Sequence, residues 1–151
     1  MYKKILVGIN GSESSLDAVK EALEIQKRDK SEVIVFYSVT RSLYEFIPTF
    51  TYIGASSSAI PLTLRHDKLN KGSELLNSVQ ELFEKEGQKV ETRLIFDISP
   101  EDYLKKVLKK EKFDLVILGS KGKHSKLRTI FFDTIPDKIV NGIPTDVLVV
   151  R

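Results

Sequence analysis

The order of apolar segments along the chain predicts an α/β fold, with a five-stranded parallel sheet and helices on both faces. Two observations lead to this fold class. Short apolar runs alternate with longer segments of helical periodicity, and the runs are nearly continuous, as is typical of strands buried on both faces of a parallel sheet. A length of 151 residues suits one domain, so residues 1–151 are expected to form a single domain.

The first half of the chain opens with a strand, a helix and a second strand. Residues 5–9 and 33–39 are rich in Ile and Val, which favour buried strands. Between them, Ser12 is a suitable N-cap, and Leu16, Val19 and Leu23 repeat at helical spacing. The segment from Arg41 to Asp67 has no clear periodicity, so we expect a long, partly packed connection. Such a connection can act as a lid or partner surface, or its aromatic residues can simply cover one end of the sheet.

The second half continues the alternation. A helix is expected from Lys68, ending at Gly87, and its apolar face is formed by Leu69, Leu75, Leu76, Val79, Leu82 and Phe83. A third strand follows at residues 90–96. Ser99 and Pro100 are typical of a helix start. A fourth strand at 113–118, a short helix at 134–141 and a last strand from Val147 to Val150 complete the predicted fold.

Composition excludes several functions. The chain has no cysteine, so it has no disulfide, thiolate nucleophile or cysteine-based metal site. No apolar stretch reaches the length of a membrane helix, and the first residues do not resemble a signal peptide, so we expect a soluble, cytoplasmic protein with no membrane contact. The two histidines, His66 and His124, have no metal-ligand spacing, and neither is near a G-x-S-x-G nucleophile motif. This predicts that the protein is not an enzyme, with weak ATPase activity as the open alternative.

The loop that follows the fourth strand has the features of an anion site. In such sheets ligands bind beyond the carboxyl ends of the strands, and Gly119 and Gly122 are three residues apart at one of these ends. We expect these glycines to allow positive φ angles and to direct backbone N–H groups at one point. Four cations follow closely, at Lys121, Lys123, Lys126 and Arg128. Phosphate is the ligand that this pattern favours, although a solvated run of lysines is more often an exposed loop than a binding site.

Nucleic-acid binding through the same basic loop is a competing interpretation from another functional class. The lysines are not accompanied by the aromatic stacking pattern of an RNA-recognition sheet, so we do not expect a nucleic-acid partner. Neither the P-loop motif nor the dinucleotide-binding glycine motif is present.

Three segments of the chain together resemble the universal stress protein family. They are the opening Ile-Leu-Val-Gly-Ile-Asn-Gly-Ser-Glu at residues 5–13, Asp-Leu-Val-Ile-Leu-Gly-Ser-Lys-Gly at 114–122, and Ile-Pro-Thr-Asp-Val-Leu-Val-Val at 143–150. The resemblance implies a five-stranded, Rossmann-like fold of the adenine-nucleotide-binding type. It also implies a homodimer formed by antiparallel pairing of the last strands, from Val147 to Val150.

The sequence departs from the pattern of the ATP-binding branch, G-x2-G-x9-G-[ST]. Gly119 and Gly122 match, but the third glycine is replaced by Phe132 or, with a one-residue insertion, by Asp133. Asn10 stands where the family usually has Asp, and Asp97 where a Gly is common. A carboxylate at Asp133 can cap the last helix and occupy the position that a phosphate would take.

Two hypotheses follow from the resemblance. The first is a homodimeric stress-response protein with a degenerate ATP motif, which acts through an unknown regulatory protein partner. The second is a nucleotide-responsive switch that binds AMP, or ATP with magnesium. Its expected binding residues are Ile9, Asn10, Ser38, Val39, Gly119, Gly122, Lys123, Asp133, Thr134 and Ile135.

Overall fold

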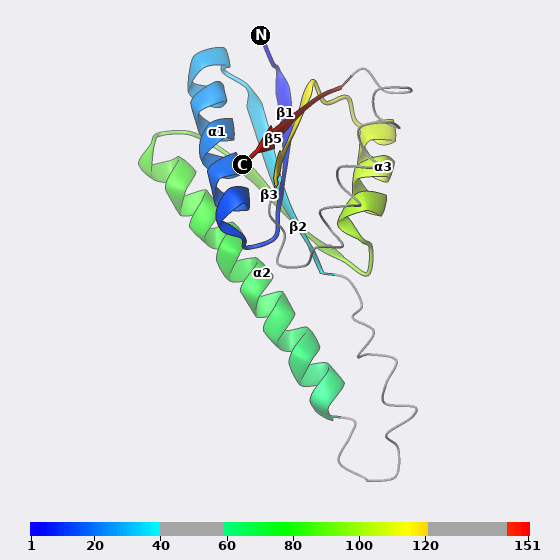
Figure 1. Ribbon diagram of the computed structural model, residues 1–151. Coiled ribbons are helices and arrows are strands. Elements are labelled where there is room, and N and C mark those ends of the chain that lie inside the picture. The colour runs from blue at the N-terminus through cyan, green and yellow to red at the C-terminus, as the bar shows by residue number, and fades with distance from the viewer. Residues whose placement is uncertain (40–58, 121–144) are drawn as a thin grey trace.

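The computed structural model describes residues 1–39, 59–120 and 145–151, and for residues 59–69 it describes the backbone alone. The elements alternate along the chain, as drawn in Figure 1. They are β1 (Lys4–Ile9), α1 (Glu13–Asp29), β2 (Glu32–Val39), α2 (Ala59–Lys85), β3 (Glu91–Phe96), α3 (Pro100–Lys110), β4 (Leu115–Gly119) and β5 (Asp146–Val150).

All five strands form one parallel sheet in the order β3-β2-β1-β4-β5. β1 is central, and its Val7 lies opposite Val35 of β2 and Ile117 of β4. These central strands are almost completely buried because helices cover both faces of the sheet. The predicted fold class is confirmed.

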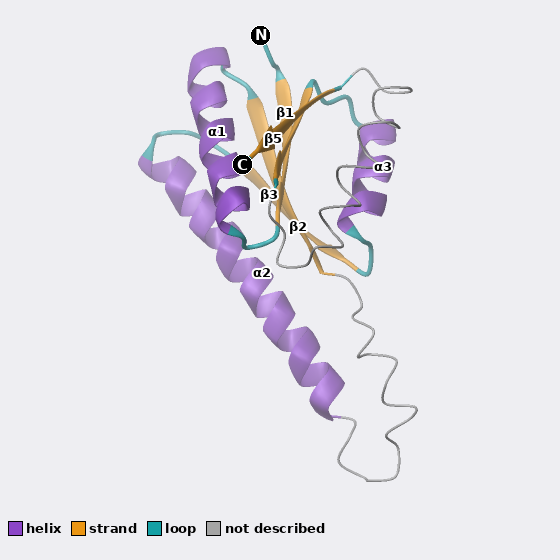
Figure 2. Cartoon of the chain, viewed as in Figure 1, coloured by secondary structure: helices purple, strands orange, loops and turns teal. Residues whose placement is uncertain are grey.

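Two hydrophobic layers hold the helices onto the sheet. One layer contains residues of α1 and α2, and the other contains residues of α3. Figure 2 shows α1 and α2 on one side of the strands and α3 on the other. In the α3 layer, the rings of Phe36 and Tyr103 have their centroids 4.7 Å apart. The split between layers follows from strand geometry, since successive side chains of a strand point to opposite faces.

The helix boundaries agree with the signals in the sequence at several points. Ser12 and Ser99 both adopt extended backbone conformations, and each side chain accepts a hydrogen bond from an N–H in the first turn of its helix. Gly87 ends α2 with φ of 67°. At the end of α1, Lys30 adopts the left-handed conformation that glycine commonly supplies, and its N–H donates to the carbonyl of Gln26.

Two expectations for the helices are wrong. α2 begins at Ala59 rather than at Lys68, so the last part of the expected connection from Arg41 to Asp67 is helical. Pro61 is compatible with this start, because proline is tolerated in the first turn of a helix. Leu16 was expected in the apolar face of α1, but 39% of its surface is exposed, because it lies in the first turn, near the end of the layer.

Other predictions concern parts of the chain outside the described residues. These are the rest of the long connection, the basic loop from Lys121 to Arg128 and the helix expected at residues 134–141. Within the described residues, no helix combines the length and hydropathy needed to cross a bilayer.

Candidate functional site

The strand order places the candidate site at the carboxyl ends of β1 and β4. The chain moves from β1 outward to β2 and β3, then returns beside β1 as β4 and continues outward to β5. α1 and α2 pack on one face of the sheet and α3 on the other, and the strand order takes the chain from β1 toward β2 and from β4 toward β5, in opposite directions. Open α/β sheets bind ligands at such a switch point. Asn10 and Ser120 are the first residues after these two strands.

Asn10 begins a tight turn into α1. Its side-chain oxygen Oδ1 accepts a hydrogen bond from the backbone N–H of Ser12 at 2.9 Å, and Gly11 between them has φ of 80°. This is an Asx turn, in which the side chain substitutes for a backbone acceptor. The amide oxygen of Asn10 is therefore engaged within the turn, and the amide nitrogen is the group that remains to donate to a ligand.

The serines after Asn10 bind the start of α1 itself. Ser12 Oγ accepts from the N–H of Ser15 at 3.2 Å, and Ser15 Oγ donates to the carbonyl oxygen of Ser12 at 2.8 Å. Ser14 Oγ lies 3.3 Å from Ser12 Oγ. Ser14 and Ser15 are also buried. The prediction that Ser12 caps the helix is confirmed, and the hydroxyls of Ser12 and Ser15 are engaged in the helix start.

Gly119 has a different role from the one predicted. The left-handed φ values among the described glycines belong to Gly11 and Gly87, so the expectation of a positive φ at Gly119 is wrong. A Cβ on Gly119 would lie 2.6 Å from both the carbonyl carbon of Ser14 and the nitrogen of Ser15. Glycine is needed here because the end of β4 passes directly against the backbone of α1.

The residue after Gly119 is held by the last strand. The backbone N–H of Ser120 donates to the carbonyl oxygen of Val150 at 2.7 Å, which continues the ladder between β4 and β5. Sequence reasoning assigned no role to Ser120, although its place directly after a strand was a usable signal. Ser120, which lies between the two glycines of the predicted phosphate loop, thus donates its N–H group to the protein.

On the other side of β1, the ends of β2 and β3 are joined through the loop that follows β3. Ser38 Oγ donates to the carbonyl oxygen of Ile98, and the N–H of Asp97 donates to the carbonyl oxygen of Val39 at 3.0 Å. Asp97 has φ of 60°, a left-handed conformation that is unusual for a residue other than glycine. Asp97 is exposed and places a carboxylate at this edge of the sheet.

The structure brings five of the predicted binding residues to the carboxyl edge. Ile9 ends β1 and Asn10 follows it, Ser38 and Val39 end β2, and Gly119 ends β4. The side chains of Ile9 and Val39 are buried. The other five predicted residues lie outside the described residues: Gly122, Lys123, Asp133, Thr134 and Ile135.

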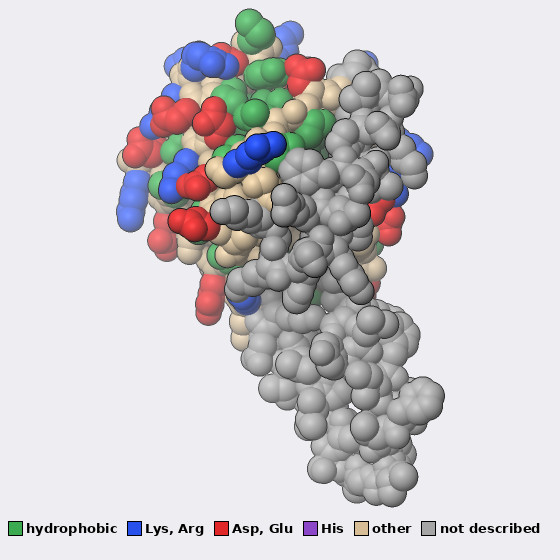
Figure 3. All heavy atoms as spheres, in the orientation of Figure 1, with side chains coloured by type: hydrophobic (Ala, Val, Ile, Leu, Met, Phe, Trp, Pro, Cys, Tyr) green, Lys and Arg blue, Asp and Glu red, His purple; other side chains and the backbone are tan. Residues whose placement is uncertain are grey.

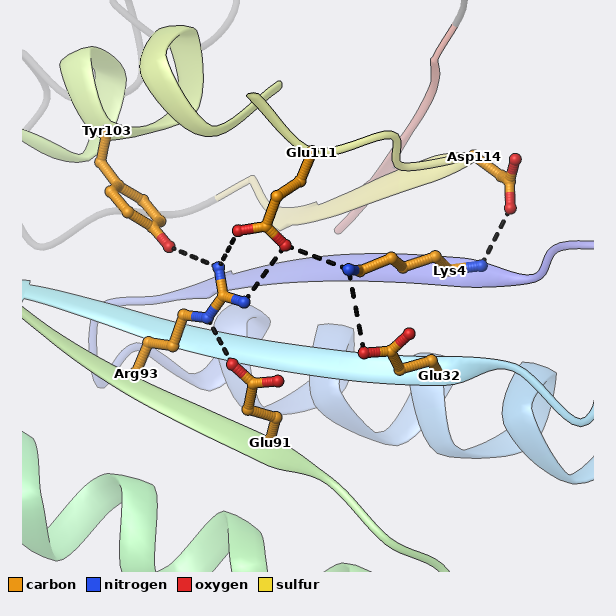
Figure 4. A network of polar contacts seen from close by, with 7 residues as sticks. All are labelled: Lys4, Glu32, Glu91, Arg93, Tyr103, Glu111 and Asp114. Carbon is orange, nitrogen blue, oxygen red and sulfur yellow. Dashed lines mark hydrogen bonds and ion pairs between the residues drawn. The ribbon is translucent and has the colours of Figure 1, made fainter. Parts of the chain in front are cut away.

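A charged network occupies the opposite, amino-terminal edge of the sheet (Figure 4). Arg93 donates to both carboxylate oxygens of Glu111, at 2.8 and 3.2 Å, and Lys4 Nζ lies 3.0 Å from Glu111 Oε2. The hydrogen bonds from Arg93, followed by those from Lys4, lower the pKa of Glu111 to about 2. Asp114 accepts the backbone N–H groups of Lys3 and Lys4, which lowers its pKa.

This network joins elements of the fold and does not form a second candidate site. It connects β1, β3 and the turn between α3 and β4, and Arg93 Nη1 also lies 3.2 Å from the hydroxyl of Tyr103 in α3. The positive and negative charges of the network are paired with one another. Among the described residues, no group of three or more His, Cys, Asp or Glu side chains could hold a metal ion.

Comparison with known proteins identifies the family of this chain. The model of the Universal stress protein family matches residues 1–151. The chain belongs to the universal stress protein family. A universal stress protein of Methanocaldococcus jannaschii is 29% identical to it over 151 residues, which cover 100% of this chain and 83% of the relative.

Solved structures of universal stress proteins share the fold. A universal stress protein from Lactobacillus plantarum superposes with a TM-score of 0.73 at 20% identity, covering 99% of this chain and 98% of that one. A universal stress protein in complex with cAMP gives 0.64 at 21% identity, covering 99% and 97%. The universal stress protein from Archaeoglobus fulgidus in complex with dAMP gives 0.59 at 15% identity, covering 99% and 98%. At these identities the likeness establishes the fold alone.

Proposed function

We propose that this universal stress protein is a homodimeric regulatory protein of the cytoplasm, which acts through protein partners and whose ATP site is degenerate. One observation carries the proposal: polar groups at the carboxyl edge are engaged within the chain. The oxygen of Asn10 accepts from Ser12, the hydroxyls of Ser12 and Ser15 bind the start of α1, and the N–H of Ser120 donates to Val150.

These internal bonds weaken the case for a triphosphate. Phosphate sites at strand ends use free backbone N–H groups and nearby hydroxyls. Here a phosphate would have to break existing hydrogen bonds to use the same groups. The third glycine of the ATP motif is also absent from the sequence, which makes binding of a triphosphate less favourable.

The proposed dimer uses the outer edge of β5, which pairs with no other strand of the described sheet. Asp146 donates its N–H to Asp114, and Val150 accepts from Ser120, so residues 146, 148 and 150 direct their backbone groups at β4. By alternation, Val147 and Val149 direct theirs outward. The four apolar side chains of β5 are only partly buried, and Figure 3 shows apolar atoms at the surface where Figure 1 draws this strand. An apolar edge that no described strand pairs with favours pairing with a second copy.

A second candidate function is binding of an adenosine monophosphate. It is favoured by the two related folds whose structures contain cAMP and dAMP, each with a single phosphate. Such a ligand would need fewer free N–H groups than ATP. Asn10, Ser38 and Val39 lie at adjacent strand ends, where a nucleoside would be bound in this proposal.

Titration calorimetry and light scattering test the proposal together. With ATP and magnesium we expect no saturable binding at micromolar concentration, and the scattering mass should be that of a dimer. Micromolar ATP affinity would overturn the degenerate site, and a monomeric mass would overturn the dimer. A parallel titration with AMP and cAMP decides the second candidate. As a check, a ligand present at about 100 times its Kd should stabilise the fold by about 2.7 kcal/mol.

A further inference from the structure

The exposed side of α3 carries lysines that no carboxylate of the described residues neutralises. Residues 105–112 contain five lysines and one glutamate. Lys106, Lys109, Lys110 and Lys112 are exposed, and within the described part of the chain none of them forms an ion pair or hydrogen bond through its side chain. We call these four residues the α3 lysine surface.

The carboxylates nearest in sequence are mostly engaged elsewhere. Glu101 binds Lys105, and Glu111 binds Arg93 and Lys4. Asp102 lies one turn before Lys106 but forms no ion pair with it in the described structure. The helix dipole accounts for cations in the last turn of α3, which contains Lys109 and Lys110. It does not account for Lys106, a turn earlier, or for Lys112, beyond the helix.

We infer that the α3 lysine surface is a docking site for an acidic segment of a protein partner. The inference rests on the proposed function, in which the protein acts through partners, and it names the surface and the chemistry of one of them. Lys106, Lys109 and Lys110 have the spacing i, i+3, i+4, which places them on one stripe of the helix. An acidic helix with carboxylates at the same spacing matches this stripe.

The composition of the surface favours a protein segment over nucleic acid. The apolar residues of α3 are buried against the sheet, and its one aromatic residue, Tyr103, is among them. Residues 100–112 contain no arginine. Single-stranded nucleic acids are commonly bound by stacking on exposed aromatics. Duplex binding often neutralises roughly 6–10 phosphates, whereas Lys106 to Lys110 span only about 6 Å of helix.

The position of the surface leaves the other proposed sites free. α3 runs antiparallel to the strands, so its last turn lies near the amino-terminal edge, whereas the candidate nucleotide site is at the carboxyl edge. Figure 1 shows α3 on the face of the sheet opposite α1, with β5 at the sheet's end. A dimer formed through β5 would present two α3 lysine surfaces. Because no apolar side chain of α3 is exposed, docking should be electrostatic and sensitive to salt.

The test uses the full chain and a fluorescent synthetic helical peptide with glutamates at positions i, i+3 and i+4. The variant K106Q/K109Q/K110Q removes three charges from the surface. The control K20Q/K85Q/K89Q removes three exposed lysines of α1, α2 and the turn before β3, so both variants have the same net charge. At about 50 mM salt we expect roughly tenfold weaker peptide binding for the surface variant, and less than about twofold for the control.

Each outcome of this experiment either supports or overturns the inference. Amide NMR shifts confined to α3 and a loss of affinity in the surface variant alone support it. Equal losses in both variants would show that only net charge matters, and a duplex DNA competitor that binds more tightly than the peptide would assign the surface to nucleic acid. Either result overturns the inference, as does the absence of peptide binding. None of these results involves ATP affinity or dimer mass, so failure here is distinguishable from failure of the proposed function.

Discussion

Gly119 lies so close to Ser14 that a Cβ on the glycine would be 2.6 Å from the serine carbonyl carbon. The contact is between two backbones, at the point where β4 ends and α1 begins. Side chains can rotate away from an added methyl group, but a backbone within a strand or a helix start cannot. A substitution at Gly119 must therefore move one element relative to the other.

Replacing Gly119 with alanine should lower the free energy of unfolding by about 1–3 kcal/mol, the usual cost of overpacking. Chemical denaturation measures this loss. Gly8→Ala is the matched control, because its Cβ would meet the side-chain ends of Leu118 and Phe36 at 3.0 to 3.2 Å. These side chains can adjust, so the control should lose less stability. Equal losses at the two positions would contradict the backbone contact.

Asp97 provides a test of the left-handed turn after β3. Because its φ is 60°, Asp97→Gly should be more stable than Asp97→Ala by about 1 kcal/mol. Both variants lack the carboxylate, so the comparison isolates the backbone conformation from any contact of the side chain. Thermal unfolding of the two proteins side by side measures the difference. An alanine variant as stable as the glycine variant would show that residue 97 is not held in this conformation.

The lowered pKa of Glu111 predicts how the free energy of unfolding changes in acid. Its pKa falls from 4.5 to about 2 on folding, so its carboxylate stabilises the fold fully above the unfolded-state pKa. As the pH falls from about 5 to about 2, the proton binds more readily to the unfolded chain and this stabilisation is lost. Glu111→Gln should cost roughly 1 kcal/mol at neutral pH, allowing for the partial exposure of the pair with Arg93.

The measurement for Glu111 is urea unfolding across this pH range. The curves for the wild type and Glu111→Gln should converge as the pH falls toward and below 2, since the carboxyl group then becomes protonated in the folded state as well as in the unfolded one. Asp29 and Asp114 also have lowered pKa values, so the variant should keep part of the acid sensitivity. A constant gap between the two curves at every pH would exclude Glu111 as a source of the pH dependence.

Val149→Pro tests the proposed dimer. The backbone of Val149 points away from β4, so proline there removes an outward N–H and no hydrogen bond to β4. We expect a folded monomer in light scattering. Leu148→Pro is the contrasting variant, because it removes a bond within the sheet and should lower stability as well. A dimeric Val149→Pro protein would rule out antiparallel pairing of β5 edges.

Local features of the sequence were sufficient to predict most of the elements. Continuous apolar runs identify strands of a parallel sheet, and Ser12, Ser99 and Gly87 mark helix ends, because these signals act within a few residues of chain. The start of α2 at Ala59 was missed. Residues 59–67 have no clear apolar periodicity that would predict a helix. Pro61 lies among them, but proline is tolerated in the first turn of a helix.

The candidate site depended more on tertiary structure. The sequence by itself determined that Asn10, Ser38 and Gly119 follow or end strands, and hence that they share one edge of a parallel sheet. Only the folded chain decided which polar groups at that edge are engaged, because the partners of Ser38 and Ser120 come from distant segments at Ile98 and Val150. Gly119 is a second example. A glycine at a strand end can be required for several reasons, and only the folded chain shows that the backbone of Ser14, about a hundred positions earlier, leaves no room for a Cβ here.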